Sequence, residues 1–130
     1  MLGQEIGRAY IVLLVDDEEM VRHVGKKLLT KLGYEVFVVS SGAEAVDFCN
    51  AANPIPDCLL LDYNMPGMNG EETLAAIRAF LPTISAVLST GYSPEDIGLD
   101  LSDGVWDRIV QKPFRLENLS QALGALRDKM

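Results

Sequence analysis

Five side chains that could take part in chemistry stand where short apolar runs of the sequence end. They are Asp16, Asp17, Asp62, Thr90 and Lys112. Such a set suits phosphoryl chemistry, because a carboxylate can attack phosphorus while a metal ion and an ammonium group neutralise the equatorial oxygens. A hydroxyl can donate a hydrogen bond to the same oxygens. The gaps between these residues are wide, so only the fold could bring them together.

The three carboxylates would repel one another if they met, and this repulsion indicates a bound cation. Two carboxylates about 4 Å apart repel by roughly 4 kcal/mol at an effective dielectric constant near 20. Three of them would cost on the order of 10 kcal/mol, comparable with the stability of a whole domain. Protons or a divalent cation must relieve this cost. Since the candidate ligands are all oxygens, the sequence favours Mg²⁺, which keeps several waters and shares phosphoryl oxygens.

Strands alternating with helices could position these residues. The predicted strands are Ile11–Val15, Glu35–Val39, Cys58–Leu61, Ile84–Leu88 and Arg108–Gln111. Strands this apolar need helices on both faces, which predicts the α/β class with one doubly wound parallel sheet. In such a sheet the functional side chains gather beyond the carboxyl ends of the strands, where the predicted chemistry also lies.

The helices between the strands are predicted from apolar spacing and from cap residues. Their apolar faces are expected at Val21, Val24, Leu28 and Leu32, at Ala45, Phe48, Cys49 and Ala52, at Leu74, Ile77 and Leu81, and at Leu116, Leu119, Leu123 and Leu126. Gly33 should close the first helix, and Ser40 or Ser41 should open the second. The helix after Ser93-Pro94 is expected to be short, because Gly98 and Gly104 follow it.

The composition excludes several classes of protein. The 130 residues suit a single domain, and the net charge of −8 argues against a nucleic-acid-binding module, which needs clustered Lys and Arg. No apolar run suits a signal peptide or membrane span, and Cys49 and Cys58 fit neither a zinc site nor a redox pair. We therefore expect a cytoplasmic domain without membrane insertion, with both cysteines as buried fillers. Residues 1–9 are predicted to be a linker or flexible N-terminus, and residues 10–130 the folded domain.

Four segments of the sequence resemble the signatures of the response-regulator receiver domain of two-component signalling. They are Val15-Asp16-Asp17-Glu18, Leu61–Gly70, Ser89-Thr90-Gly91 and Lys112-Pro113-Phe114, in the order and spacing of that family. The resemblance extends from about Tyr10 to Lys129. It implies a flavodoxin-like (βα)5 fold with the strand order 2-1-3-4-5.

The resemblance also implies a role for each acidic residue. Asp62 would accept a phosphoryl group from a phosphohistidine of a sensor histidine kinase or a histidine phosphotransfer domain. Asp17 and Asp62 would bind Mg²⁺ together with the main-chain carbonyl of Asn64, and Asp16 would act through water. Lys112 would contact the phosphoryl oxygens. The domain would catalyse only its own aspartyl phosphorylation and dephosphorylation.

The remaining implied roles concern how the signal leaves the site. Thr90 would move toward the phosphoryl group and pass the change to the face of the fourth helix, fifth strand and fifth helix. This face is the family's usual partner surface, so we expect a monomer or a weak dimer. The Lys112-Pro113 bond would be cis. Ile109 stands where the family often has Tyr or Phe, so no ring can rotate there. Tyr92 is predicted to shield the acyl phosphate from water.

The same residues allow other interpretations. Asp16 and Asp17 could only favour the start of a helix, as we expect of Glu18 and Glu19. A phosphatase of the haloacid-dehalogenase type would need an Asp where this chain has Asn64. A flavodoxin-like cofactor binder would need a Gly-, Ser- or Thr-rich loop after the first strand. A stand-alone regulator or docking module, and a receiver domain cut from a hybrid histidine kinase, both remain open.

Overall fold

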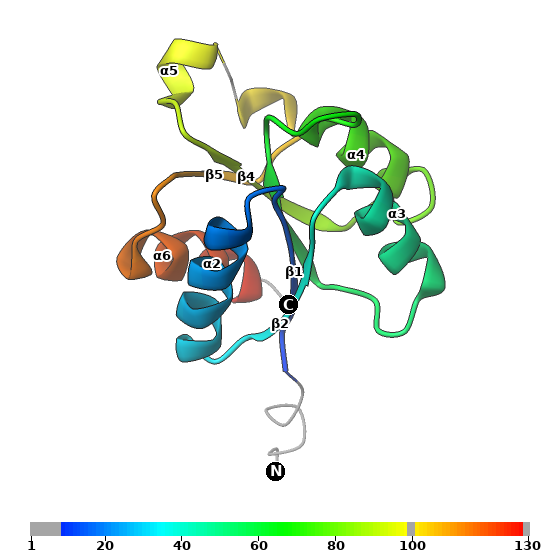
Figure 1. Ribbon diagram of the computed structural model, residues 1–130, viewed down its shortest axis with the longest axis horizontal. Coiled ribbons are helices and arrows are strands. Elements are labelled where there is room, and N and C mark those ends of the chain that lie inside the picture. Colours follow the sequence, from blue (N-terminus) through cyan, green and yellow to red (C-terminus); the bar gives the residue numbers. More distant parts are fainter. Residues whose placement is uncertain (1–8, 99–100, 129–130) are drawn as a thin grey trace.

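The computed structural model describes residues 9–98 and 101–128, so the predicted N-terminal linker lies, except for Ala9, outside the described residues. One five-stranded sheet runs through this part of the chain, with helices on both faces (Figure 1). The strands are β1 (Ile11–Val15), β2 (Glu35–Val39), β3 (Cys58–Asp62), β4 (Ser85–Thr90) and β5 (Arg108–Gln111). Neighbouring strands are parallel in the order β2-β1-β3-β4-β5, which confirms the predicted topology.

The helices lie in two layers around the sheet. They are α2 (Glu19–Lys31), α3 (Gly42–Ala51), α4 (Gly70–Arg78), α5 (Pro94–Ile97) and α6 (Leu116–Arg127), with a 3₁₀ turn at Leu101–Asp103. α2 and α6 cover one face of the sheet, and α3 and α4 cover the other (Figure 1). α5 is short, as the glycines after it predicted.

Successive residues of each central strand face opposite layers, which divides the core in two. Leu14 and Leu60 pack with Leu123 of α6 in one cluster. Leu13 and Leu59 belong to the other cluster, with side chains of α3 and α4. Each buried Leu stabilises the fold by roughly 2 kcal/mol, so both layers hold the strand ends in place.

The predicted caps are confirmed. Ser41 opens α3, where its hydroxyl accepts a hydrogen bond from the Glu44 N–H at 3.1 Å. Gly33 follows the end of α2 with a φ of +95°, a conformation that glycine adopts without strain. Cys49 and Cys58 are buried and free, as predicted.

The predicted apolar face of α2 was wrong at Val24, which is 39% exposed. The helix instead turns Gly25 and Leu29 toward the sheet. A Cβ atom at Gly25 would lie 2.7 Å from Leu14 Cδ2 and 3.1 Å from the Phe114 ring. The helix therefore approaches β1 and Phe114 closely because this residue has no side chain.

Three further predictions needed correction. Ala52 does not lie on the buried face of α3, because it caps the helix in the left-handed conformation (φ 57°) and is exposed. β4 runs to Thr90 and β3 to Asp62, because the pairing of these strands continues to Asp62↔Ser89 and Thr90↔Gln111. These two functional residues are therefore the last residues of their strands.

Among the described residues, no helix combines the length and apolar character needed to cross a membrane.

Candidate functional site

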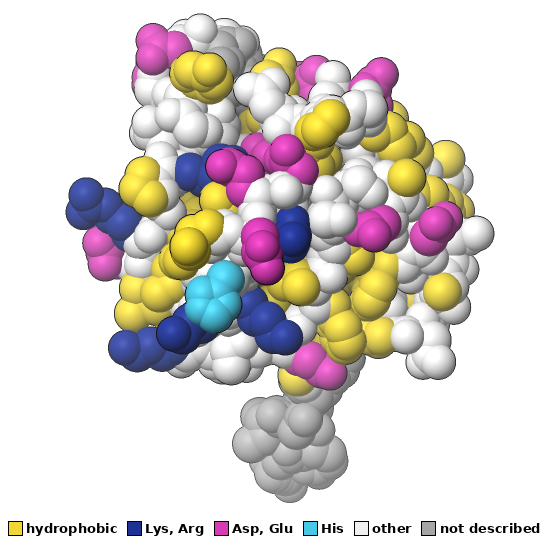
Figure 2. Space-filling model, in the orientation of Figure 1, with side chains coloured by type: hydrophobic (Ala, Val, Ile, Leu, Met, Phe, Trp, Pro, Cys, Tyr) yellow, Lys and Arg dark blue, Asp and Glu magenta, His cyan; other side chains and the backbone are white. Residues whose placement is uncertain are grey.

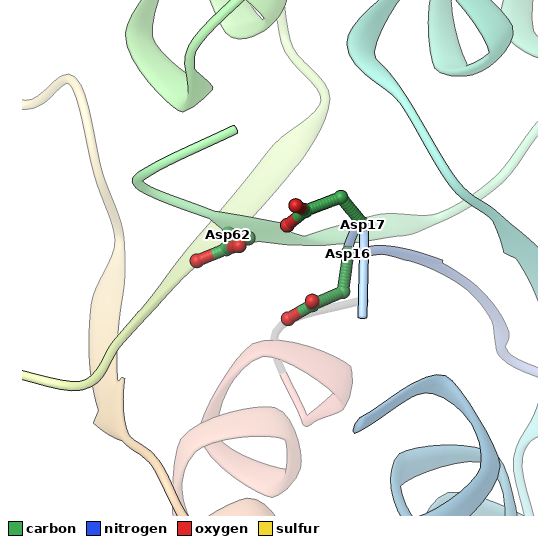
Figure 3. A group of neighbouring side chains, drawn as sticks. All are labelled: Asp16, Asp17 and Asp62. Atoms are coloured by element: carbon green, nitrogen blue, oxygen red, sulfur yellow. The ribbon is translucent and has the colours of Figure 1, made fainter. Parts of the chain in front are cut away.

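The site is a cluster of three carboxylates at the carboxyl ends of β1 and β3. Figure 3 shows Asp16 and Asp17 beyond the end of β1, beside Asp62 at the end of β3. One carboxylate oxygen from each residue lies within 4.8 Å of the others. Asp16 and Asp62 are buried, whereas Asp17 is exposed. The strand order makes β1 and β3 direct neighbours, and this is why residues far apart in sequence meet.

Lys112 brings a positive charge to the cluster from the end of β5. Its Nζ donates hydrogen bonds to Asp16 Oδ2 at 3.2 Å and to Asp62 Oδ1 at 3.1 Å. Glu18 Oε1 lies 3.7 Å from the same nitrogen. Glu18 was predicted only to favour the start of a helix. Its ion pair with Lys112 was not predicted. The Lys112-Pro113 bond is cis, as predicted.

The electrostatics of the cluster show an excess of negative charge. Burial, and then the charge of Asp16, raise the pKa of Asp62 to about 6 despite the opposing effect of Lys112. Burial also raises the pKa of Asp16. Burial alone would lower the pKa of Lys112, but attraction to Asp16 and Asp62 raises it overall. One ammonium group therefore does not neutralise the carboxylates, and an all-oxygen donor set with surplus charge fits a hard divalent cation such as Mg²⁺.

Hydrogen bonds fix the turn that carries Asp16 and Asp17. Asp16 Oδ1 accepts from the Glu18 N–H at 2.9 Å, so one oxygen of this buried carboxylate serves the turn and the other serves Lys112. Arg22 Nη1 donates to the main-chain carbonyl of Asp16 at 2.8 Å. Nothing in the sequence pattern marked Arg22 for this contact.

The other predicted residues face the same hollow, which has a volume of about 620 Å³. Its lining includes Asp17, Asp62, Asn64, Thr90, Tyr92 and Lys112. Thr90 is buried, and its hydroxyl accepts a hydrogen bond from the Tyr92 N–H at 3.1 Å. The Tyr92 side chain is 55% exposed at the edge of the hollow. The fold thus brings together every residue that the sequence analysis selected.

The loop after β3 is held against the site by the start of α4. Asn69 and Glu72 form a capping box, with hydrogen bonds of 2.8 and 2.9 Å between each side chain and the other's main-chain N–H. A Cβ atom at Gly70 would lie 2.6 Å from the main-chain oxygen of Asp62. α4 therefore begins directly on the Asp62 backbone, and the loop with Asn64 is fixed at both ends.

The chain matches a known protein family over most of its length. The sequence model of the response regulator receiver domain matches residues 12–124. The transcriptional regulatory protein KdpE of Mycobacterium tuberculosis is 34% identical over 115 residues, which are 88% of this chain and 50% of that protein. Sensor kinase CckA of Brucella abortus is 30% identical over 118 residues, which are 91% of this chain and 12% of that protein. The chain thus spans half or less of the length of these two relatives.

A related protein with the same fold has been solved with ligands bound. The response regulator TrrA of Thermotoga maritima, in complex with Mg²⁺ and BeF, superposes with a TM-score of 0.77 at 33% identity. The superposition covers 89% of this chain and 97% of TrrA. The chain therefore shares its fold with a response regulator that has been solved in complex with Mg²⁺ and BeF.

Proposed function

The chain belongs to the response regulator receiver family, and we propose that its Asp62 accepts a phosphoryl group from a phosphohistidine of a sensor histidine kinase or histidine phosphotransfer domain. One observation carries this proposal. Asp62 is a buried carboxylate at the floor of a hollow, within 4.8 Å of Asp16 and Asp17 and 3.1 Å from the Lys112 ammonium group. Acetyl phosphate and Mg²⁺ test it directly, because the chain should gain one phosphoryl group in intact mass spectrometry.

The reaction needs little from the protein beyond position and charge. An oxygen of Asp62 attacks phosphorus, the P–N bond of the phosphohistidine breaks, and its electron pair returns to the imidazole nitrogen. Lys112 exchanges its contact with Asp62 for one with a phosphoryl oxygen. Mg²⁺ held by Asp17, Asp62 and the Asn64 carbonyl, with Asp16 acting through water, would neutralise the charge on the same phosphoryl group.

Thr90 links the site to the segment before α5. Its hydroxyl accepts the Tyr92 N–H, so a shift of Thr90 toward a phosphoryl oxygen changes the support of the backbone at Tyr92. Ile109 on β5 is half-buried and has no ring that could follow Thr90. The backbone from Gly91 to α5 is therefore the proposed route from Asp62 to the face formed by α5, β5 and α6.

Tyr92→Ala should shorten the lifetime of the aspartyl phosphate. The exposed ring stands at the edge of the hollow that contains Asp62, and there it limits the approach of water. We expect hydrolysis about fivefold faster, equivalent to about 1 kcal/mol of barrier. Loss of phosphate is followed by intact mass after the donor is removed. Tyr92→Phe keeps the ring and should retain the wild-type lifetime, whereas an unchanged lifetime in Tyr92→Ala contradicts the shielding role.

The phosphohistidine partner is proposed to cover an apolar groove beside Lys112. The groove has a volume of about 150 Å³ and is lined by Met20, Val21, Val24, Lys112, Pro113 and Phe114. Met20 is 71% exposed, which is unusual for a large apolar side chain. Figure 2 shows Lys and Arg side chains below the single histidine, and hydrophobic and acidic side chains above it. The groove therefore suits a partner surface that presents apolar side chains.

Met20→Asp should slow phosphoryl transfer from a histidine phosphotransfer domain by roughly tenfold, because a charge in a desolvated contact costs about 1.4 kcal/mol or more. Labelling by acetyl phosphate, which needs no docking, should be unchanged. Ile55→Asp is the matched control, since Ile55 is 47% exposed and precedes β3 at the other end of the sheet. Equal slowing with acetyl phosphate would place the defect in the site instead of the docking surface.

The domain could stand alone or form part of a longer protein, and its parent is a separate proposal. A hybrid histidine kinase agrees with the match to CckA, and a regulator with its own output agrees with the match to KdpE. Phosphoryl transfer rates from candidate histidine kinases, compared at equal concentration, would separate these two parents.

A further inference from the structure

We infer that Arg22 is a positioning residue that orients the Mg²⁺-binding turn at residues 16–18, an inference that rests on the proposed function. The Arg22 guanidinium reaches back from α2 and donates from Nη1 to the main-chain carbonyl of Asp16 at 2.8 Å. That carbonyl belongs to the peptide group that joins Asp16 to Asp17. Its orientation sets the direction in which Asp17 leaves β1 and presents its carboxylate.

Three other polar groups of the turn have partners that do not involve the Arg22 side chain. The Asp16 N–H donates to the Val39 carbonyl of β2 at 3.3 Å, and the Glu18 N–H donates to Asp16 Oδ1 at 2.9 Å. The Glu18 carbonyl accepts from the Arg22 N–H at 3.1 Å in the first turn of α2. Arg22 therefore contacts the turn twice, through its backbone at Glu18 and through its side chain at Asp16.

The surroundings of Arg22 favour this orientation of its side chain. Arg22 also lines a hollow of about 540 Å³ together with Ser40, Glu44 and Asp47. Hydrogen bonds from Ser40, and then the charge of Arg22, lower the pKa of Glu44. The guanidinium thus donates to the Asp16 carbonyl and is close enough to Glu44 of α3 to affect that carboxylate. A planar group with several donors in fixed directions can hold that carbonyl while it lies near that carboxylate.

Charge and position predict opposite effects when Arg22 is replaced. A positive charge near the carboxylate cluster repels Mg²⁺, so removing the charge alone should strengthen Mg²⁺ binding. Removing the hydrogen bond releases the Asp16–Asp17 peptide group, which should weaken Mg²⁺ binding, as does the loss of an outer partner of a metal ligand. The sign of the change therefore identifies which role Arg22 has.

Titration calorimetry with Mg²⁺ alone, on the full chain, tests the inference. We expect Arg22→Gln to bind roughly tenfold more weakly than wild type, the lower end of the effect for outer partners of metal ligands. Arg22→Lys keeps a charge and a donor and should recover part of the affinity. The matched control is Lys26→Gln, which removes one charge a turn further along α2 and should bind as well as wild type or more tightly.

Three outcomes separate the inference from the proposed function. Mg²⁺ binding by Arg22→Gln that equals or exceeds the wild type overturns the positioning role and leaves the phosphoryl-acceptor proposal intact. A wild-type chain that binds no Mg²⁺ overturns both. Thermal unfolding in a chelator shows whether each variant folds. If Arg22→Gln does not fold, Arg22→Lys decides the question. Weaker Mg²⁺ binding by folded Arg22→Lys supports the inference, and Mg²⁺ binding equal to that of the wild type overturns it.

Discussion

Intact mass spectrometry after incubation with Mg²⁺ and acetyl phosphate should show one added phosphoryl group on the wild type and none on Asp62→Asn. The amide of Asn fills nearly the same space as the carboxylate, but its oxygen lacks the charge needed to attack phosphorus. The substitution also removes one of the two carboxylates that hydrogen-bond Lys112. A loss of more than about a hundredfold in the labelling rate corresponds to about 3 kcal/mol of barrier.

Two control variants make the result specific to Asp62. Asp47→Asn changes an exposed carboxylate on α3 and should be labelled like the wild type. Asp17→Asn should be labelled more slowly and should need more Mg²⁺, because it removes a proposed ligand and keeps the acceptor. Full labelling of Asp62→Asn would move the acceptor to another carboxylate, and Asp17, the exposed member of the cluster, would be the next to test.

Without a divalent cation, the protein should become less stable as the pH rises from about 5 to about 7.5, which is the opposite of the usual effect of paired carboxylates. The pKa of Asp62 is raised from 3.8 in the unfolded chain to about 6 in the fold. The folded state therefore holds a proton that the unfolded state has lost, and this contribution to stability disappears as the pH passes through about 6. A shift of this size is worth up to about 3 kcal/mol below pH 3.8, of which roughly half remains to be lost between pH 5 and pH 7.5, and the raised pKa of Asp16 acts in the same direction.

Other groups with shifted pKa values do not disturb this pH window. The pKa of Lys112 is raised above 10.5, so its contribution persists through neutral pH. The pKa of Glu44 is lowered, so its contribution is complete above 4.5 and is lost only in acid. The pH dependence between these limits therefore reports on the buried carboxylates at the ends of β1 and β3.

Urea unfolding at the two pH values, in a chelator and in excess Mg²⁺, measures the effect. Mg²⁺ binds the deprotonated cluster, so it should restore stability at the higher pH and add little at the lower one. Asp62→Asn should lose the part of the pH dependence that Asp62 contributes, because it carries no titrating group at that position. A wild type that is equally stable at both pH values in chelator would show that Asp62 is not held in a raised-pKa environment.

The sequence was sufficient to predict the strands and the residues that meet at their ends. Continuous apolar runs such as Ile11–Val15 have few other interpretations, and parallel topology sends their carboxyl ends to one edge. The ends of β3 and β4 were placed too early, since Asp62 and Thr90 are polar and the apolar pattern stops before them. Strand pairing continues through both residues because the backbone, and not the side chain, forms the ladder.

The contacts that the sequence analysis missed depend on distances between elements. Glu18 reaches Lys112 because β1 and β5 end at the same edge, and no local pattern reports this. Arg22 bonds a main-chain carbonyl, and every residue carries such an acceptor, so residue type gives no signal. The rotation of α2 that exposes Val24 is set by Phe114, which packs on Gly25 from the far end of the chain.

The contact between Gly25 and Phe114 restricts how α2 could be redesigned. Phe114 stands two residues after Lys112, so a side chain grafted onto position 25 would push on the segment that aims the ammonium group. A library that changes partner preference can vary the solvent-facing half of α2 freely, including Met20, His23 and Lys27. Position 25 must stay invariant in that library, or a change of specificity will be confounded with a loss of the chemistry itself.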